Sequence, residues 1–397
     1  MTAQPAAAPL TIATDFGARA AAWFDGNTPA GFHADRTDYA APDLAACRAY
    51  EAAMHRAGLA GITWPTDYGG HGLTLREHLA MSREFGARAL PESVNSIGKE
   101  LCGPVIQAVG SAAQKAALLP RILDMTEIWC QGFSEPEAGS DLARLRTKVT
   151  RDGDGWRANG QKIWTSGAYR SQKCLLLART GSVEDRHRGM VMFALPMDRE
   201  GVRVNTIRSI DGRDSFCEVF LDNVWLDEAE MLGAPDEGWS AAIRVLEIER
   251  ATNRMYRAWR FENELRHLVS AIASEPATRG LLEDGHTRRR IAQALTDIDM
   301  VKGYVELAVE ALAEGDRIGA RGSLMKLHWS ESHQNFVKLA LDLVSQLPAN
   351  AGPVARRARA RFEQGYLFSR AATIYAGSTE VQLDIIAQRI LNLPKGR

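Results

Sequence analysis

Three regions with different periodicity follow one another along this chain of 397 residues, and their order constrains the fold more than any other feature. Up to about Thr126, and again from Ser240 onward, apolar residues recur at helical spacing. Between these regions, short runs separated by turn residues are typical of β-strands. A chain of this length exceeds one typical hydrophobic core. We therefore predict an α+β multidomain protein with an N-terminal helical domain (1–126), a central β domain (127–235) and a C-terminal helical domain (236–397).

Strand signals are clearest in the middle region. RTKVT (146–150), the turn sequence RDGDG (151–155) and WRANGQKIWTS (156–166) read as a strand, a turn and a second strand. Further strand candidates are Cys174–Ala178, Met190–Leu195 and Phe216–Trp225. The middle region is therefore expected to be a β domain.

Composition excludes several classes of protein. The hydrophobic share of 45% and the charged share of 24% match an ordinary globular protein, and a net charge of -1 gives no general attraction to nucleic acid or anionic membrane. No uncharged apolar run reaches the ~18 residues of a membrane span, and the N-terminus lacks the pattern of a signal peptide. The five cysteines are scattered without C-x-x-C spacing. We expect a cytoplasmic protein without a metal site, a nucleic-acid partner or a membrane partner. We interpret the arginines of residues 356–361 as a solvated helix face, with contact to a phosphate or a partner as the alternative.

A turn followed by a helix is predicted near the C-terminus, in TIYAGSTEVQLDIIAQRIL (373–391). Gly377 suits the tight turn, and Thr379 followed three residues later by Gln382 fits a capping box. Apolar residues then recur at helical spacing, at positions 381, 385, 386 and 390. Spacing alone favours a capped helix that packs on a core.

Four separated stretches together resemble the acyl-CoA dehydrogenase family. They are WPTDYGGHGL (64–73), WCQGFSEPEAGSDL (129–142), NGQKIWTSGA (159–168) and YLFSRAATIYAGSTEVQ (366–382). The four occur in the family's order and at roughly its spacing, so the resemblance covers nearly the whole chain. It implies the family's fold, in which a central β-barrel or sandwich-like domain lies between an N-terminal helical domain and a C-terminal four-helix bundle.

The resemblance also implies a bound FAD. A flavin that accepts hydride needs a dry stacking face and a donor near its N5 atom. Trp164 resembles the family tryptophan that packs against the ring, and Ser166 the hydroxyl near N5. The other implied contacts are Phe133 and Ser134 at the polar edge of the ring, Ser378 and Glu380 at the dinucleotide, and Ser140 near the pantetheine arm of the substrate. Glu135, Pro136 and Gly139 are expected to shape the turn.

The catalytic base is predicted away from its commonest family position. Many members carry a glutamate directly after the tyrosine of the C-terminal signature, where this chain has Ala376. LEIER (246–250) instead resembles the pattern of isovaleryl-CoA and long-chain dehydrogenases, which implies Glu249 as the base. No basic residue lies three or four positions from Glu249, whereas Glu247 has Arg244 and Arg250 at that spacing, so Glu247 suits an exposed ion pair. The alternative for Glu249 is a surface or distantly paired glutamate.

The loop at Ala376 and Gly377 keeps a role that needs no side chain. In the family, a backbone N–H at this position holds the thioester carbonyl and makes the α-proton more acidic, as an oxyanion hole does. The resemblance therefore implies that Ala376 and Gly377 contact the substrate.

Two family stretches are missing, and they bear on the partners. R-x-x-F and Q-x-x-G-G reach the FAD of a neighbouring subunit in many members, but here Arg279 is followed by Leu282, and residues 346–352 read QLPANAG. We expect a homo-oligomer or a heteromer with a related chain, an acyl-CoA substrate and an electron-transfer flavoprotein as electron acceptor. The C-terminal sequence looks like that of actinobacterial-type members, some of which act on bulky or steroid thioesters as complexes of two related chains. Alternatives are a flavin monooxygenase or oxidase on the same fold, a non-catalytic subunit, and an acyl-carrier-protein substrate.

Overall fold

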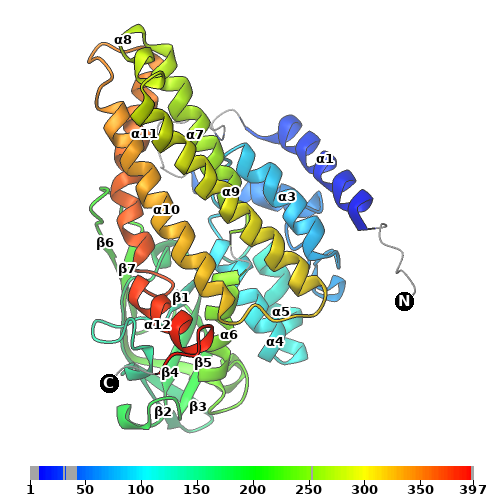
Figure 1. The fold of residues 1–397 in the computed structure, drawn as a ribbon. Coiled ribbons are helices and arrows are strands. Elements are labelled where there is room, and N and C mark those ends of the chain that lie inside the picture. Colours follow the sequence, from blue (N-terminus) through cyan, green and yellow to red (C-terminus); the bar gives the residue numbers. More distant parts are fainter. Residues whose placement is uncertain (1–8, 30–31, 33–42, 252–253, 395–397) are drawn as a thin grey trace. The chain divides into compact units, whose positions relative to one another are not determined.

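The computed structural model describes residues 9–29, 32, 43–251 and 254–394, which belong to two compact units (Figure 1). One unit, here called the sheet unit, comprises residues 44–70 and 93–249. The other, the bundle unit, comprises the described residues up to Asp43 together with residues 71–92 and those from Arg250 onward. The predicted α+β fold class, with a β region between helical regions, is confirmed.

The sheet unit contains a sheet and short helices. Its helices are α2 (Leu44–Arg56), α4 (Gly103–Val109), α5 (Ala112–Leu123) and α6 (Gly238–Ala251), the last of which ends two residues inside the bundle unit. Its strands are β1 (Trp129–Gly132), β2 (Lys148–Asp152), β3 (Gly155–Lys162), β4 (Lys173–Arg179), β5 (Met190–Pro196), β6 (Val202–Ile207) and β7 (Phe216–Asp227).

Among the described residues, seven strands form one mixed sheet in the order β1-β4-β2-β3-β7-β6, with β5 paired to β4. The β1–β4 pair is parallel, and the β2–β3, β3–β7, β6–β7 and β4–β5 pairs are antiparallel. The predicted hairpin is confirmed, because β2 ends at Asp152 and β3 begins at Gly155. β1 and β6 have no counterpart among the predicted strands.

Strand β4 explains how the sheet is covered on both faces. Leu175 and Leu177 belong to a core shared with α4, α5 and α6, whereas Cys174, Leu176 and Ala178 belong to a second core shared with residues of β3 and β7. Alternate side chains of a strand point to opposite faces, so the continuous apolar run of β4 serves both cores. The second core lies between strands, as expected for a barrel-like or sandwich-like domain.

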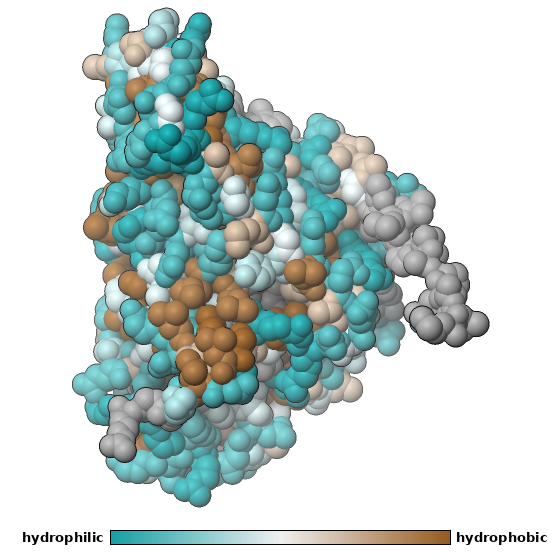
Figure 2. Space-filling model, in the orientation of Figure 1, coloured by the Kyte–Doolittle hydropathy of each residue, from teal (hydrophilic) through white to brown (hydrophobic). Residues whose placement is uncertain are grey.

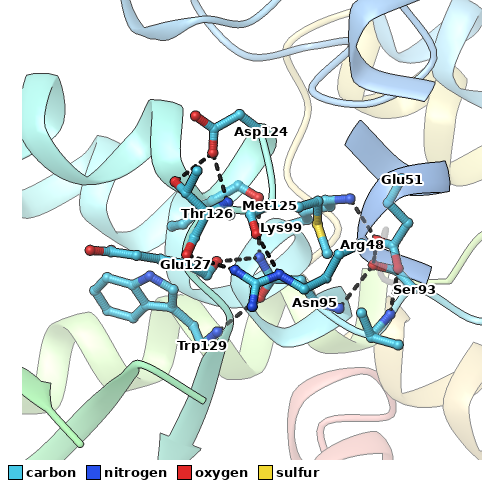
Figure 3. A network of polar contacts seen from close by, with 12 residues as sticks. Arg48, Glu51, Ser93, Asn95, Lys99, Asp124, Met125, Thr126, Glu127 and Trp129 are labelled. Carbon is cyan, nitrogen blue, oxygen red and sulfur yellow. Dashed lines mark hydrogen bonds and ion pairs between the residues drawn. The ribbon is translucent and has the colours of Figure 1, made fainter. Parts of the chain in front are cut away.

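The start of β1 is held by a buried asparagine (Figure 3). Asn95 is fully buried, and its Nδ2 donates to the carbonyl oxygens of Ile122 and Glu127 at 3.1 and 2.9 Å. Its Oδ1 accepts the backbone N–H of Trp129, the first residue of β1, at 2.9 Å. A buried amide that is satisfied at both ends ties the end of α5 to the sheet. This fixes the point from which the Phe133–Ser134 loop leaves β1.

The bundle unit is helical. Its helices are α1 (Pro9–Asn27), α3 (Leu75–Ala87), α7 (Arg257–Ser274), α8 (Pro276–Arg279), α9 (Gly285–Ala313), α10 (Arg321–Val344), α11 (Pro353–Ser369) and α12 (Thr379–Arg389). In Figure 1, α7, α9, α10 and α11 run side by side, and α1 lies along α3. The buried residues of α7 include Ala258, Phe261, Leu265 and Leu268, at the three- and four-residue spacing of one helix face.

The arginines of α11 correct one expectation. Arg356 is exposed as predicted, but Arg359 donates to the carbonyl oxygen of Val344 at 3.3 Å and to that of Leu347, at the end of α10. Arg361 lies 3.5 Å from the carboxylate of Glu264 on α7. The interpretation as one solvated face is therefore wrong for these two arginines, whose guanidinium groups satisfy a helix end and a buried carboxylate. None of the described helices combines the length and the apolar composition that crossing a membrane requires.

Candidate functional site

Residues Phe133 and Ser134 leave the end of β1 and are tied by backbone to the end of β3. The N–H of Ile163 donates to the carbonyl oxygen of Ser134 at 2.9 Å. Glu135 and Ala138 then exchange two backbone hydrogen bonds of 3.0 Å, which close a tight turn. Phe133 is buried and Ser134 is half-buried. The structure therefore brings the Phe133–Ser134 loop beside the segment that carries Trp164.

A buried ion pair also supports the Phe133–Ser134 loop. Lys162 is fully buried, and its Nζ lies 2.7 Å from Oε1 of Glu135 and 3.2 Å from the carbonyl oxygen of Phe133. The Glu135 carboxylate also accepts the backbone N–H groups of Arg146 and Thr147, at 2.5 and 2.8 Å. Glu135 therefore shapes the turn as predicted, through a partner that the sequence analysis did not single out.

The pKa values of this pair reflect two opposing effects. Burial raises the pKa of the Glu135 carboxyl, but the Lys162 ammonium and the hydrogen bonds from Thr147 and Arg146 outweigh it, so the pKa is lowered. Burial lowers the pKa of Lys162, and the Glu135 carboxylate only partly offsets this effect. The charged pair beneath the loop depends on both partners being present.

Trp164 is presented outward on a strained backbone. Its φ angle is 58°, in the left-handed region that side chains other than Gly, Asn and Asp rarely adopt. Its side chain is 57% exposed and meets Phe216 edge to face, with ring centroids 6.1 Å apart. Such a conformation costs about 1–3 kcal/mol and persists where the surroundings enforce it, often at functional sites. An exposed indole held in this way offers a flat face to a ligand.

The residues that follow Trp164 are anchored to the start of β7 and to the residue before it. Thr165 and Cys217 exchange backbone hydrogen bonds of 3.0 and 3.1 Å, and the N–H of Gly167 donates to the carbonyl oxygen of Ser215 at 2.9 Å. Ser166 lies between these anchors and is half-buried. Ser140 is exposed beyond the Glu135–Ala138 turn. Ser134, Trp164 and Ser166 thus belong to one hydrogen-bonded region of the sheet unit.

The Ala376–Gly377 loop in the bundle unit has two consecutive left-handed residues, with φ angles of 58° and 88°. Ser378 is the N-cap of α12, and its Oγ accepts the N–H of Val381 at 3.4 Å. The predicted capping box with Thr379 as the cap is therefore wrong by one residue. Gln382 does not close such a box, because its Nε2 donates to the carbonyl oxygens of Ala376 and Gly377 at 3.0 and 3.1 Å.

Glu380 stands exposed in the first turn of α12. Its hydrogen bond with Ser378 and its backbone contacts lower the pKa of its carboxyl, and the nearby Lys326 ammonium acts in the same direction. A carboxylate at a helix N-terminus is also favoured by the helix dipole. The structure therefore brings Ala376, Gly377, Ser378 and Glu380 together at the start of one helix.

The predicted base lies on α6, but its side chain lies outside the described residues. The backbone of Glu249 is helical, within Gly238–Ala251. Ala242 and Val245, seven and four positions before it on the helix, are fully buried in the sheet unit. The partners of Glu249 remain a prediction.

Lys162 and Gln382 are the residues that sequence reasoning missed. A lysine in a strand reads as solvent-facing, yet Lys162 stands in a buried position of β3. Gln382 was predicted to cap a helix and instead holds the preceding loop. Arg279 and Gln346 stand where the two missing family stretches were sought, and both bond within their own chain. Arg279 donates to the carbonyl oxygen of Ala273, and Gln346 donates to that of Asp342, both at 3.2 Å.

The donor set of the sheet unit fits the flavin that the resemblance implies. An isoalloxazine ring needs an aromatic face and polar groups at its edge, and Trp164, Ser166 and the Phe133–Ser134 loop supply groups of these kinds within one anchored region. The loop at Ala376 belongs to the other unit.

Comparison with protein families gives three consecutive matches. Residues 32–126 match the acyl-CoA dehydrogenase N-terminal domain, residues 130–224 the middle domain, and residues 236–391 the C-terminal domain. The chain is 38% identical over 350 residues to acyl-CoA dehydrogenase IpdE1 of Mycobacterium tuberculosis, which covers 88% of both chains. It is 35% identical to IpdE1 of Mycolicibacterium smegmatis, again covering 88% of each.

Solved structures share the fold. A structure described as the Tcur3481–Tcur3483 steroid ACAD superposes with a TM-score of 0.84 over 100% of both chains, at 24% identity. The ChsE4–ChsE5 complex from Mycobacterium tuberculosis superposes with a TM-score of 0.80, over 99% of this chain and 100% of the other, also at 24% identity.

Proposed function

Because the chain belongs to the acyl-CoA dehydrogenase family, we propose that it oxidises the Cα–Cβ bond of an acyl-CoA thioester to the 2-enoyl thioester with FAD as its cofactor. The observation that carries the proposal is the exposed Trp164 indole on a left-handed backbone, anchored beside the Phe133–Ser134 loop. A strained, exposed tryptophan needs a partner for its face, and a flavin ring supplies one.

In this proposal the residues of the sheet unit position the cofactor. When bound, FAD supplies the acceptor for the hydride that leaves Cβ. Trp164 stacks on the ring and Ser166 donates near N5. Phe133 and Ser134 contact the polar edge of the ring, while Ser378 and Glu380 approach the dinucleotide. Lys162 and Glu135 act only through the loop that they hold.

The substrate contacts are proposed on the remaining residues. Glu249 takes the proton from Cα, which requires a carboxylate on the face of the substrate opposite the cofactor. The backbone N–H of Ala376, beside Gly377, donates to the thioester carbonyl and stabilises negative charge that develops on its oxygen. Ser140 lies along the pantetheine arm.

Partners follow from the family resemblance and from the surface of the bundle unit. Electron-transfer flavoprotein is the proposed electron acceptor. We propose a heteromer with a related chain, because Arg279 and Gln346 bond within their own chain where many members reach a neighbour's FAD. Large apolar side chains are also exposed, and Figure 2 shows hydrophobic residues gathered on the face that it draws. The exposed apolar residues of the bundle unit include Met300, Leu307, Ile374 and Leu391, with exposed fractions of 46%, 70%, 68% and 60%. Exposed apolar surface of this kind favours a protein partner.

Anaerobic titration tests the proposed reaction. The protein, co-expressed with candidate related chains, is mixed with a panel of acyl-CoAs that runs from short straight chains to bulky polycyclic ones. The flavin band at the visible absorbance maximum should bleach with at least one thioester. A flavin that no thioester bleaches, or a protein that stays colourless with FAD and candidate partners, would contradict the proposal. Rapid reoxidation of the bleached flavin by oxygen would favour an oxidase instead.

A further inference from the structure

The strongest unassigned feature is a buried polar side chain at the start of α12. Among the described residues of this helix, only Gln382 is fully buried, while the apolar positions 381, 385, 386 and 390 are half-buried. An amide inside a protein needs hydrogen-bond partners to offset the loss of water. The partners of this amide lie outside its own helix, in the loop that precedes it.

The geometry determines which end of the amide faces the loop. Gln382 stands 3.0 Å from the carbonyl oxygen of Ala376 and 3.1 Å from that of Gly377. Both groups are acceptors, so only the NH₂ end of the side chain can face them. A glutamine that closes a capping box accepts the N–H of the N-cap residue through its oxygen. Gln382 therefore does not act as a helix cap.

The loop needs such support because of its backbone. Ala376 is left-handed with φ of 58°, and Gly377 follows with 88°. The left-handed conformation costs a residue with a Cβ atom roughly 1–2 kcal/mol. One donor that bridges both carbonyl oxygens offsets this strain and holds two successive peptide planes. Since a trans peptide is planar, with its N–H opposite to its C=O, the two held carbonyl groups fix the N–H groups of Gly377 and Ser378. The N–H of Ala376 belongs to the preceding peptide plane, and the hold on the Ala376 carbonyl acts on it through the backbone angles of Ala376.

The other side of Ala376 is also held. Tyr375 packs against Trp329 of α10, with ring centroids 6.3 Å apart, and its N–H donates to the carbonyl oxygen of Ala371 at 3.0 Å. Gln334 of α10 donates to the carbonyl oxygen of Ser369 at 2.8 Å and to Oγ1 of Thr373 at 3.1 Å. Ala376 thus lies between an anchored tyrosine and the carbonyl groups that Gln382 holds.

We infer that Gln382 is a positioning residue, which acts through the Ala376–Gly377 loop to aim its backbone at the thioester carbonyl. The inference rests on the proposed function for its consequence in catalysis, but the hold on the loop is a property of the chain alone. Misplacing a group that contacts the reacting carbonyl can reduce the rate by roughly 100-fold. Removing the amide should therefore lower kcat more than it raises KM.

The test compares Gln382→Met, which keeps the length of the side chain but has no donor, with Gln388→Met on the same helix. Gln388 is half-buried and takes no part in the proposed site. The first measurement is amide hydrogen exchange over residues 371–381, which needs neither substrate nor turnover. Exchange in this segment should become faster in Gln382→Met and stay at the parent rate in Gln388→Met. Unchanged exchange in Gln382→Met would overturn the hold on the loop.

The second measurement reads the consequence in the FAD-loaded protein. For Gln382→Met we expect kcat to fall roughly 10- to 100-fold per bound FAD. The carbonyl stretch of bound ¹³C-labelled enoyl-CoA should shift to higher frequency because the carbonyl is less polarised. A loss of activity that only follows lost FAD or lost folded protein, with the carbonyl band at the parent frequency, would overturn the positioning role. If no acyl-CoA reduces the flavin of the parent protein, the proposed reaction is contradicted. The hydrogen-exchange result would still decide whether Gln382 holds the Ala376–Gly377 loop.

Discussion

The two candidate loops are held by different kinds of interaction. The Phe133–Ser134 loop of the sheet unit rests on a buried charged pair, Lys162 with Glu135, at 2.7 Å. The Ala376–Gly377 loop of the bundle unit rests on the neutral amide of Gln382. Removing one partner of a buried ion pair leaves an uncompensated charge, whereas removing a neutral donor leaves only unpaired carbonyl groups. The cofactor side should therefore be the less tolerant of substitution, although both loops present backbone to a ligand.

The largest effect on the rate of flavin reduction is expected for Glu249, which belongs to neither of the two supports. Glu249→Gln keeps the size of the side chain and removes the proposed proton acceptor, so flavin reduction by an acyl-CoA should slow by roughly 10² to 10⁴. FAD should remain bound, because both loops are intact. Stopped-flow absorbance of the flavin measures the rate. Glu247→Gln on the same helix is the matched control and should have a much milder effect. Losing a solvated helix ion pair costs only about 0.2–0.5 kcal/mol of stability.

A parent-like rate in Glu249→Gln would refute the assignment of the base. Ala376→Glu in that background is a second, smaller expectation. A carboxylate restored at the common family position should recover part of the rate, unless the added side chain blocks the pocket, which a lowered affinity for enoyl-CoA would reveal.

Lys162→Met tests whether the charged support contributes more stability than the neutral one. With its partner removed, the buried Glu135 carboxylate is uncompensated, and we expect a loss of about 3–5 kcal/mol in the free energy of unfolding. Gln382→Met should lose less, about 1–3 kcal/mol. Denaturant unfolding followed by fluorescence gives both values. Arg146→Met, which breaks the exposed pair with Glu137 at 2.9 Å, is the control and should change stability by less than about 1 kcal/mol.

Equal losses of unfolding free energy in Lys162→Met and Gln382→Met would contradict the distinction between charged and neutral supports. The double variant Lys162→Met with Glu135→Gln sharpens it, since it removes both charges at once. It should be more stable than Lys162→Met alone.

The bundle unit has a buried charge of its own, the carboxylate of Glu264, and pH tests it. Burial raises the pKa of Glu264, but the hydrogen bond from His333 at 3.0 Å and the Arg361 guanidinium outweigh it and lower the pKa to about 2. A carboxyl whose pKa is lowered in the folded state stabilises the fold above its ordinary value of 4.5, and this stabilisation is lost as pH falls toward 2.

Urea unfolding between about pH 6 and pH 3 should therefore show a steeper loss of stability in the parent than in Glu264→Gln. Over this pH range the parent should lose at most about 2 kcal/mol more than the variant, because a carboxyl with a pKa of about 2 is still largely ionised at pH 3. Glu363→Gln, which removes an exposed carboxylate of α11, is the control and should leave the slope near that of the parent. Equal slopes in the parent and Glu264→Gln would contradict the lowered pKa.

The smallest expected effect on folding concerns Trp164. Its side chain is 57% exposed, so Trp164→Ala should barely change the unfolding temperature while it weakens FAD binding by about 0.5–1.5 kcal/mol from lost stacking. Tyr169→Ala, at 53% exposure in the same segment, is the control and should keep the FAD content of the parent. FAD per chain after gel filtration measures both. An equal loss of FAD in the two variants would remove the assigned stacking role.

Periodicity and turn chemistry were enough to predict much of the sheet. The β2–β3 hairpin follows from its Gly-Asp turn, and the apolar run of β4 marks a strand that is buried on both faces. β6 was missed because its residues are half-buried or exposed, which leaves no apolar alternation to detect. β1 is only four residues long.

The supports of the site could not be read from the sequence, because they depend on tertiary pairing. The role of Lys162 depends on its pairing with Glu135, 27 residues earlier in the chain. The role of Arg361 depends in the same way on Glu264. Gln382 fits a capping box by spacing, yet Ser378 already caps the helix and the loop carbonyls lie within reach. The left-handed φ of Trp164 is equally invisible in the sequence, since tryptophan carries no preference for it.

A crystal structure of the protein with its partner chain, FAD and an enoyl-CoA would show both loops with their ligands at once. We expect the flavin ring against the Trp164 indole and the thioester oxygen within about 3 Å of the Ala376 nitrogen. We also expect the Glu249 carboxylate beside Cα on the opposite face of the substrate. A flavin bound away from Trp164, or a thioester carbonyl held by other donors with Glu249 turned to solvent, would contradict the proposed site.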